Sequence, residues 1–295
     1  MIGRARVRPR QGSAPVSTVP SITLNNGVAV PQIGFGVWQV PPGETEVAVA
    51  TALRAGYRGI DTASAYGNES GVGAALAASG VPRDEVVVTT KLWNHDQGYD
   101  ATLRAFDASM DKLGLDYLDV YLIHWPMPAA DRYVDTWQAF EKLYADQRIR
   151  AIGVSNFQIP HLEKLFDTAG VLPAVNQIEL HPYLQQRELR AFHDEFGVRT
   201  EAWSPLAKGG ALLSDAAVTG IAEKHGRTPA QVVLRWHVQL GNIVIPKSVT
   251  PSRIEENIRV FDFALDDADL ATLANLDRGR RTGPDPDTFN LGFDG

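Results

Sequence analysis

The chain has 295 residues, of which 44 % are apolar and none is cysteine. This length can bury a large hydrophobic core, and the lack of cysteine excludes disulfides, thiolate nucleophiles and thiolate metal ligands. The formal net charge of −7 argues against nucleic acid as a partner. No apolar run approaches the roughly 18 residues of a membrane-spanning helix. We therefore predict a soluble, cytoplasmic protein without a membrane or nucleic-acid partner, and we expect a monomer.

The first twenty residues differ from the rest of the chain. They carry four arginines in the first ten positions, no acidic residue and no apolar core of a signal peptide, which argues against secretion. An organelle transit peptide and a nucleic-acid-binding arm are also rich in arginine. We interpret residues 1–20 as a disordered leader and predict that residues 21–295 form a single domain.

Short β-branched runs alternate with helical periodicity along the rest of the chain. Continuous apolar runs of this length are typical of parallel strands that are buried on both faces. Eight strands are predicted, at residues 32–37, 57–61, 85–91, 118–124, 149–155, 174–180, 198–204 and 242–247.

Amphipathic helices are predicted between these strands. The clearest span residues 99–113 and 44–55, and a glycine that can end the helix follows each. Asn68 is the expected side-chain cap of the helix after it. Residues 22–30 read as a separate β-hairpin around an Asn-Gly turn.

Eight strands in alternation with helices predict an α/β fold with a parallel sheet, closed into a (β/α)8 TIM barrel. Active sites of such barrels lie at the C-terminal ends of the strands. Most of the strand ends in this chain carry hydrogen-bonding or charged side chains, which predicts one functional site. The residues at these strand ends are Trp38, Asp61, Lys91, His124, Ser155, Asn156, Gln177, Trp203, Ser204 and Lys247.

Seven motifs at or near these strand ends resemble the motifs of the aldo-keto reductases. The resemblance runs from about Ile22 to Phe263. The motifs occur in order and read GIDTASAYGNE, VVTTKLWN, LIHWP, GVSNF, NQIELHPY, AWSPL and IPKSVTPSRIEEN. Within the family, the chain is most similar to bacterial reductases of 2,5-diketogluconate and related carbonyls. The resemblance implies an enzyme that uses NADPH to reduce aldehydes or ketones, keto-sugars and small dicarbonyls among them, to alcohols.

The residues that match the family's catalytic tetrad are Tyr66, Lys91, Asp61 and His124. Hydride addition to a carbonyl leaves negative charge on its oxygen, so a proton donor must lie within hydrogen-bond reach. A phenol with a pKa of about 10 is a weak acid, and we expect Lys91 to lower the pKa of Tyr66. Asp61 is expected to hold Lys91, and His124 to orient the carbonyl. Each residue taken alone also fits a structural role.

A Rossmann-type cofactor site is not supported, because the glycines at 71–73 lack the third glycine of the motif. Barrels instead bind phosphate near their last two strands, where the segment PKSVTPSR lies. The resemblance implies that residues after the middle strands bind the nicotinamide. It also implies that residues after the last strand bind the 2′-phosphate and the adenine. The predicted cofactor residues are Ser155, Asn156, Gln177, Trp203, Ser204, Leu206, Lys247, Ser248, Val249, Thr250, Arg253, Glu256 and Asn257.

Three tryptophans, Trp38, Trp93 and Trp125, are predicted to line an apolar substrate pocket with His124. The resemblance places the C-terminal tail over the mouth of the barrel, and Phe289 is expected to reach the pocket. No metal is predicted, because neither HxH nor HExxH occurs.

Two other functions fit the same residues. Some relatives with this barrel are regulatory subunits that bind NADPH and turn over weakly. A phosphate-binding isomerase barrel could use the site after the last strand, with Lys91 and His124 as acid and base. Nicotinamide binding separates the isomerase from the other two functions.

Overall fold

The computed structural model describes residues 19–292. Apart from Val19 and Pro20, the predicted leader therefore lies outside the described residues. The proposal that residues 21–295 form one domain stays a prediction. No helix in the described part of the chain is long and apolar enough to cross a membrane.

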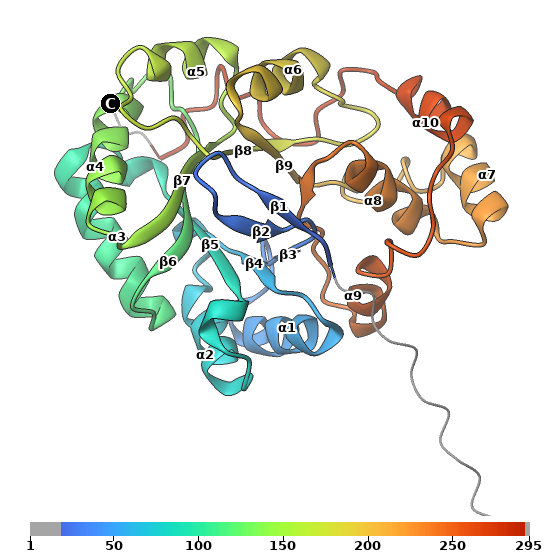
Figure 1. Ribbon diagram of the computed structural model, residues 1–295, viewed down its shortest axis with the longest axis horizontal. Coiled ribbons are helices and arrows are strands. Elements are labelled where there is room, and N and C mark those ends of the chain that lie inside the picture. The colour runs from blue at the N-terminus through green and yellow to red at the C-terminus, as the bar shows by residue number, and fades with distance from the viewer. Residues whose placement is uncertain (1–18, 293–295) are drawn as a thin grey trace, which may run out of the picture.

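The predicted barrel is confirmed. Eight parallel strands pair in the order β10-β9-β8-β7-β6-β5-β4-β3, with helices around them (Figure 1). The sheet closes on itself where the segment before β3 bonds to β10, because Gly34 N donates to Val244 O at 2.9 Å and Val244 N donates to Gln32 O at 3.0 Å. The strands are β3 (Phe35–Gly36), β4 (Gly59–Asp61), β5 (Val87–Leu92), β6 (Leu118–Ile123), β7 (Ile149–Ser155), β8 (Val175–Glu179), β9 (Arg199–Trp203) and β10 (Ile243–Val244).

All eight predicted strands exist, and most are shorter than predicted. The largest differences lie at the seam, where β3 and β10 have two residues each. Here the two segments come so close that a Cβ on Gly34 would lie 3.2 Å from the side chain of Ile245. Across the seam, Ile33 and Val244 form an isolated parallel bridge, and single backbone hydrogen bonds continue.

The predicted hairpin is also confirmed, as an antiparallel pair of β1 (Ser21–Thr23) and β2 (Ala29–Pro31). Its turn contacts the start of the barrel strands, because Asn26 Nδ2 donates to Arg150 O at 2.9 Å and Asn25 Nδ2 donates to Pro173 O at 3.0 Å. The hairpin therefore covers the N-terminal ends of the strands, away from the predicted site (Figure 1).

The helices follow the apolar periodicity, and the prediction for residues 99–113 matches α3 to the residue. The others are α1 (Pro42–Ala55), α2 (Glu69–Ala78), α4 (Tyr133–Ala145), α5 (Ile159–Phe166), α6 (Arg187–Phe196), α7 (Ala216–His225), α8 (Pro229–Gln239), α9 (Pro251–Asn257) and α10 (Asp267–Ala274).

Asn68 precedes α2 as predicted, but its side chain does not cap the helix. It is buried, accepts a hydrogen bond from Thr62 Oγ1 at 2.8 Å and donates to Val37 O at 3.0 Å. The expected cap is wrong because two loops at the C-terminal end of the barrel compete for the amide. Asn68 fixes these loops to each other.

Candidate active site

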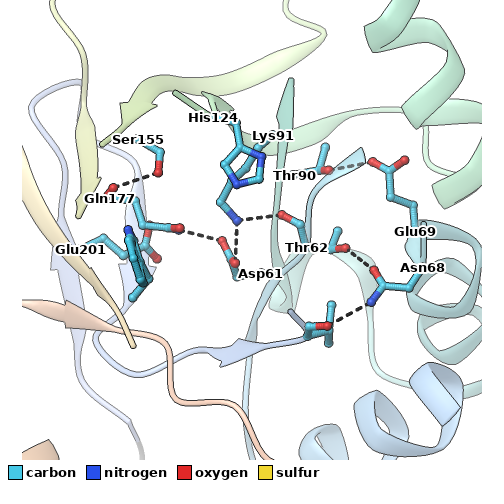
Figure 2. A network of polar contacts seen from close by, with 12 residues as sticks. Asp61, Thr62, Asn68, Glu69, Thr90, Lys91, His124, Ser155, Gln177 and Glu201 are labelled. Atoms are coloured by element: carbon cyan, nitrogen blue, oxygen red, sulfur yellow. Dashed lines mark hydrogen bonds and ion pairs between the residues drawn. The ribbon is translucent and has the colours of Figure 1, made fainter. Parts of the chain in front are cut away.

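Three of the four predicted catalytic residues lie at the C-terminal ends of neighbouring strands of the barrel (Figure 2). Asp61 ends β4, Lys91 lies in β5, and His124 directly follows β6. Tyr66 lies in the short 3-10 helix Ser64–Tyr66, which follows β4. Since β4, β5 and β6 pair in parallel register, their C-terminal ends place these side chains at one mouth of the barrel.

The predicted contact between Asp61 and Lys91 is present. Lys91 is 0 % exposed, and its Nζ donates to Asp61 Oδ1 at 2.7 Å and to Thr62 O at 2.9 Å. Burial alone would lower the pKa of Lys91, but Asp61 and the nearby Tyr66 phenol outweigh burial and raise it. Lys91 is therefore a buried ammonium ion at neutral pH.

Tyr66 lies above this ammonium. The centroid of its half-buried ring is 5.2 Å from Lys91 Nζ and 5.7 Å from the His124 ring. The expected lowering of the Tyr66 pKa is wrong for the protein alone: burial raises the pKa, and Lys91 opposes burial only in part. The phenol is thus fully protonated at neutral pH, which is the form that donates a proton.

His124 is enclosed by aromatic rings. Its centroid lies 5.2 Å from the Trp93 ring and 6.5 Å from the Trp125 ring. Burial and the positive charge of Lys91 lower the pKa of His124 well below its usual value, so the imidazole is neutral. A neutral imidazole carries one N–H, which can donate a hydrogen bond to a carbonyl oxygen without adding charge.

The predicted nicotinamide residues also lie together at this mouth. Trp203 Nε1 donates to Asn156 Oδ1 at 2.8 Å, Asn156 Nδ2 donates to His124 O at 2.9 Å, and Ser155 Oγ donates to Gln177 O at 2.8 Å. Asn156 has a φ of 65° and Ser204 a φ of 46°, a backbone conformation that is uncommon outside glycine. Leu206 follows in the half-buried loop after β9.

Gln177 makes a contact that the sequence did not predict. Its Nε2 donates to Asp61 Oδ2 at 2.8 Å and to Glu201 Oε2 at 3.0 Å. Glu201 is a buried acid in β9, two residues before Trp203. Residues two apart on a strand share a face. An acid two residues before Trp203, which was predicted to contact the cofactor, could therefore have indicated that Glu201 lies near the site.

The residues predicted for the 2′-phosphate and adenine follow β10. Lys247, Val249, Thr250 and Arg253 are exposed, and Ser248 is partly exposed. Neither Lys247 nor Arg253 forms an ion pair with any residue that the structure describes. The segment therefore fits a phosphate group, which such cations bind.

The other two residues predicted for this end of the cofactor are less available. Glu256 accepts a hydrogen bond from Thr228 Oγ1 at 2.7 Å, and Asn257 is buried. Their predicted contacts with adenine stay predictions.

The predicted substrate tryptophans differ in exposure. Trp125 is buried, Trp93 is half-buried, and Trp38 is 40 % exposed. Lys208 Nζ lies over the Trp38 ring, 5.5 Å from its centroid. Phe289 of the C-terminal segment lies 4.3 Å from the Trp125 ring, so this segment does reach the aromatic cluster around His124.

The C-terminal segment is held by an acid that the sequence analysis did not single out. Glu179, at the end of β8, accepts hydrogen bonds from Thr282 N at 2.6 Å and Gly283 N at 3.0 Å. A Cβ on Gly283 would lie 2.4 Å from the Trp203 ring, so only glycine fits there. Asn94 Nδ2 binds Leu291 O at 2.8 Å and fixes the end of the segment near Trp93.

A barrel with a buried lysine, a protonated tyrosine and a neutral histidine at its mouth, beside exposed cations, defines a carbonyl-reducing class of oxidoreductase. The sequence model of the Aldo/keto reductase family matches residues 32–278. The chain belongs to the aldo/keto reductase family. Family membership confirms the predicted enzyme class, an NADPH-dependent aldo-keto reductase.

Similar proteins agree with this assignment over nearly the whole chain. An aldo-keto reductase of Mycolicibacterium smegmatis is 61 % identical over 272 residues, which are 92 % of this chain and 98 % of that protein. Methylglyoxal reductase DkgA of Escherichia coli is 51 % identical over a match that covers 91 % of this chain and 97 % of the DkgA chain. The crystal structure of a Gox0644 variant in complex with NADPH has a TM-score of 0.89 at 52 % identity and covers 92 % of this chain and 99 % of its own.

Proposed function

We propose that this protein reduces small aldehydes and ketones to alcohols with NADPH, and that Tyr66 donates the proton. The observation that carries this proposal is the buried Lys91, which lies between the Asp61 carboxylate and the Tyr66 ring. The regulatory-subunit alternative uses the same fold but requires no such proton donor.

NADPH, when bound, supplies a hydride to the carbonyl carbon. The neutral His124 orients the carbonyl oxygen by one hydrogen bond, and the Tyr66 hydroxyl donates its proton to that oxygen as negative charge develops. Lys91 stabilises the resulting phenolate, and Asp61 keeps Lys91 in position. Gln177 Oε1 remains an acceptor for the cofactor's carboxamide, because its Nε2 is already bonded to two carboxylates.

Small 2-oxoaldehydes such as methylglyoxal are the proposed substrate class. The DkgA proteins of Escherichia coli and Salmonella typhimurium, both named methylglyoxal reductases, are 51 % and 52 % identical to this chain. Trp93, Trp125 and Tyr66 surround His124, and the C-terminal segment packs on Trp125. These rings offer apolar walls close to the reacting group, which suits a short substrate.

Consumption of NADPH, followed by absorbance, tests the proposal across a panel that contains methylglyoxal, short aldehydes and 2,5-diketogluconate. We expect turnover with several members and the highest kcat/KM for methylglyoxal. Tight NADPH binding without turnover on the whole panel would favour a regulatory subunit. A higher kcat/KM for 2,5-diketogluconate would contradict the proposed substrate class.

Arg253 is expected to confer the preference for NADPH over NADH. Hydrogen bonds to charged groups contribute about 1.5–3 kcal/mol, so Arg253→Ala should weaken NADPH binding by roughly 10- to 100-fold and leave NADH binding nearly unchanged. Fluorescence quenching at fixed ionic strength gives the Kd of both cofactors. Arg259→Ala, another exposed arginine just beyond α9, is the matched control for loss of one positive charge. Equal losses for both cofactors in Arg253→Ala would show that Arg253 does not contact the 2′-phosphate.

A further inference from the structure

A second buried carboxylate lies beside the Asp61–Lys91 pair. Glu201 is 7 % exposed, and its Oε2 accepts a hydrogen bond of 3.0 Å from Gln177 Nε2. The same nitrogen donates to Asp61 Oδ2 at 2.8 Å (Figure 2). Gln177 and Glu201 are register partners on β8 and β9, whereas Asp61 ends β4. One amide therefore joins two carboxylates across the interior of the barrel.

We propose that Glu201 is a positioning residue of the reduction site: it holds the Gln177 amide against Asp61, and its proton sets the charge beside Lys91 and Tyr66. This inference rests on the proposed role of Tyr66 as proton donor.

The first part of the inference follows from the donors and acceptors in this network. An ionised carboxylate only accepts hydrogen bonds, a protonated carboxyl still has an acceptor oxygen, and an amide carries its two donors on nitrogen. Two acceptors on one side therefore force the Gln177 nitrogen toward Asp61 and Glu201 and the oxygen away from them. With Glu201 absent, one of the two constraints on the amide is lost.

The second part follows from the surroundings of Glu201. A small cavity of about 20 Å³ is lined by Asp61, Glu201 and mainly apolar side chains, including Val30, Val175 and Ile243. The neighbouring strands β8 and β10 place the uncharged Gln177 and Ile243 beside Glu201.

The titratable groups near Glu201 are Asp61, Lys91 and Tyr66. Burial and Asp61 raise the pKa of Glu201 to about 7, although Gln177 and Lys91 act in the opposite direction. Glu201 therefore changes charge near neutral pH.

Ionisation of Glu201 acts on the proton donor. A negative charge at Glu201 raises the pKa of Lys91 and of Tyr66. The phenol then becomes a weaker acid, so proton donation to the carbonyl oxygen slows. Reduction should be faster when Glu201 is protonated and slower when it is ionised.

The first test is the pH profile of kcat/KM for an aldehyde that the wild type reduces. We expect the wild-type value to fall on the order of threefold to tenfold as the pH rises through about 7. Glu201→Gln, which keeps an acceptor but has no charge, should lack this fall. Glu69→Gln removes another buried carboxylate, one that is bonded to Thr90, and it should keep the wild-type profile.

The second test needs neither cofactor nor turnover. Between about pH 4.5 and pH 7, Glu201 is ionised in the unfolded chain but protonated in the folded protein, so it lowers wild-type stability as the pH rises. Glu201→Gln lacks this loss, so its Tm relative to the wild type should rise over that range.

The two tests separate failure of this inference from failure of the proposed function. The role of Glu201 would be overturned if kcat/KM of Glu201→Gln fell near pH 7 as in the wild type. It would also be overturned if the Tm difference between Glu201→Gln and the wild type did not vary with pH. Wild-type turnover by Tyr66→Phe would instead overturn the proposed proton donor.

Discussion

Replacement of Tyr66 by phenylalanine should lower kcat for aldehyde reduction by about 10²- to 10⁴-fold, the usual contribution of a positioned general acid. The ring and its contacts with His124 and Lys91 remain possible, because both involve the aromatic ring. The Kd for NADPH should therefore stay close to that of the wild type. Steady-state kinetics and fluorescence quenching measure the two quantities.

Tyr99→Phe is the matched control for this variant. Tyr99 begins α3 and is 39 % exposed, so its loss of a hydroxyl should not affect turnover. Near-normal kcat in Tyr66→Phe would remove Tyr66 from the role of acid. A loss of NADPH affinity as large as the loss of kcat would indicate a positioning role instead.

Replacement of Lys91 by methionine should also nearly abolish turnover, because it removes the ammonium that stabilises the phenolate. It leaves the buried Asp61 without its ion pair, although the hydrogen bond from Gln177 remains. Breaking a buried pair in this way costs about 3–5 kcal/mol, so the free energy of unfolding should fall by a similar amount. Denaturant unfolding and steady-state kinetics measure the two effects.

The double variant Asp61→Asn/Lys91→Met separates catalysis from stability. It removes both charges, so no unpaired carboxylate remains, and much of the lost stability should return. Turnover should stay absent, because the phenol still lacks its ammonium partner. If the stable double variant regains activity, the pair is structural and Lys91 does not assist Tyr66.

The periodicity of the sequence predicted the fold well. Apolar runs in alternation with amphipathic segments predicted the eight strands and the bounds of α3. Such patterns indicate which side of each local segment is buried. The strand-end rule then brought Asp61, Lys91 and His124 to one mouth, since parallel strands share the direction of their C-terminal ends. Strand bounds were poorer at the β3–β10 seam, where segments far apart in the chain pair through one isolated bridge, Ile33 with Val244, and single backbone hydrogen bonds.

Only the tertiary structure decided how the polar residues share their hydrogen bonds and charge. Asn68 binds two loops rather than its helix, and Gln177 bridges to Asp61, 116 positions away, and to Glu201. The pKa of Tyr66 is raised rather than lowered, because burial of the phenol outweighs the charge of Lys91. A linear sequence shows which residue types occur at the strand ends. Burial and long-range pairing depend on where every other segment packs, so they set the charges of this site only in the folded protein.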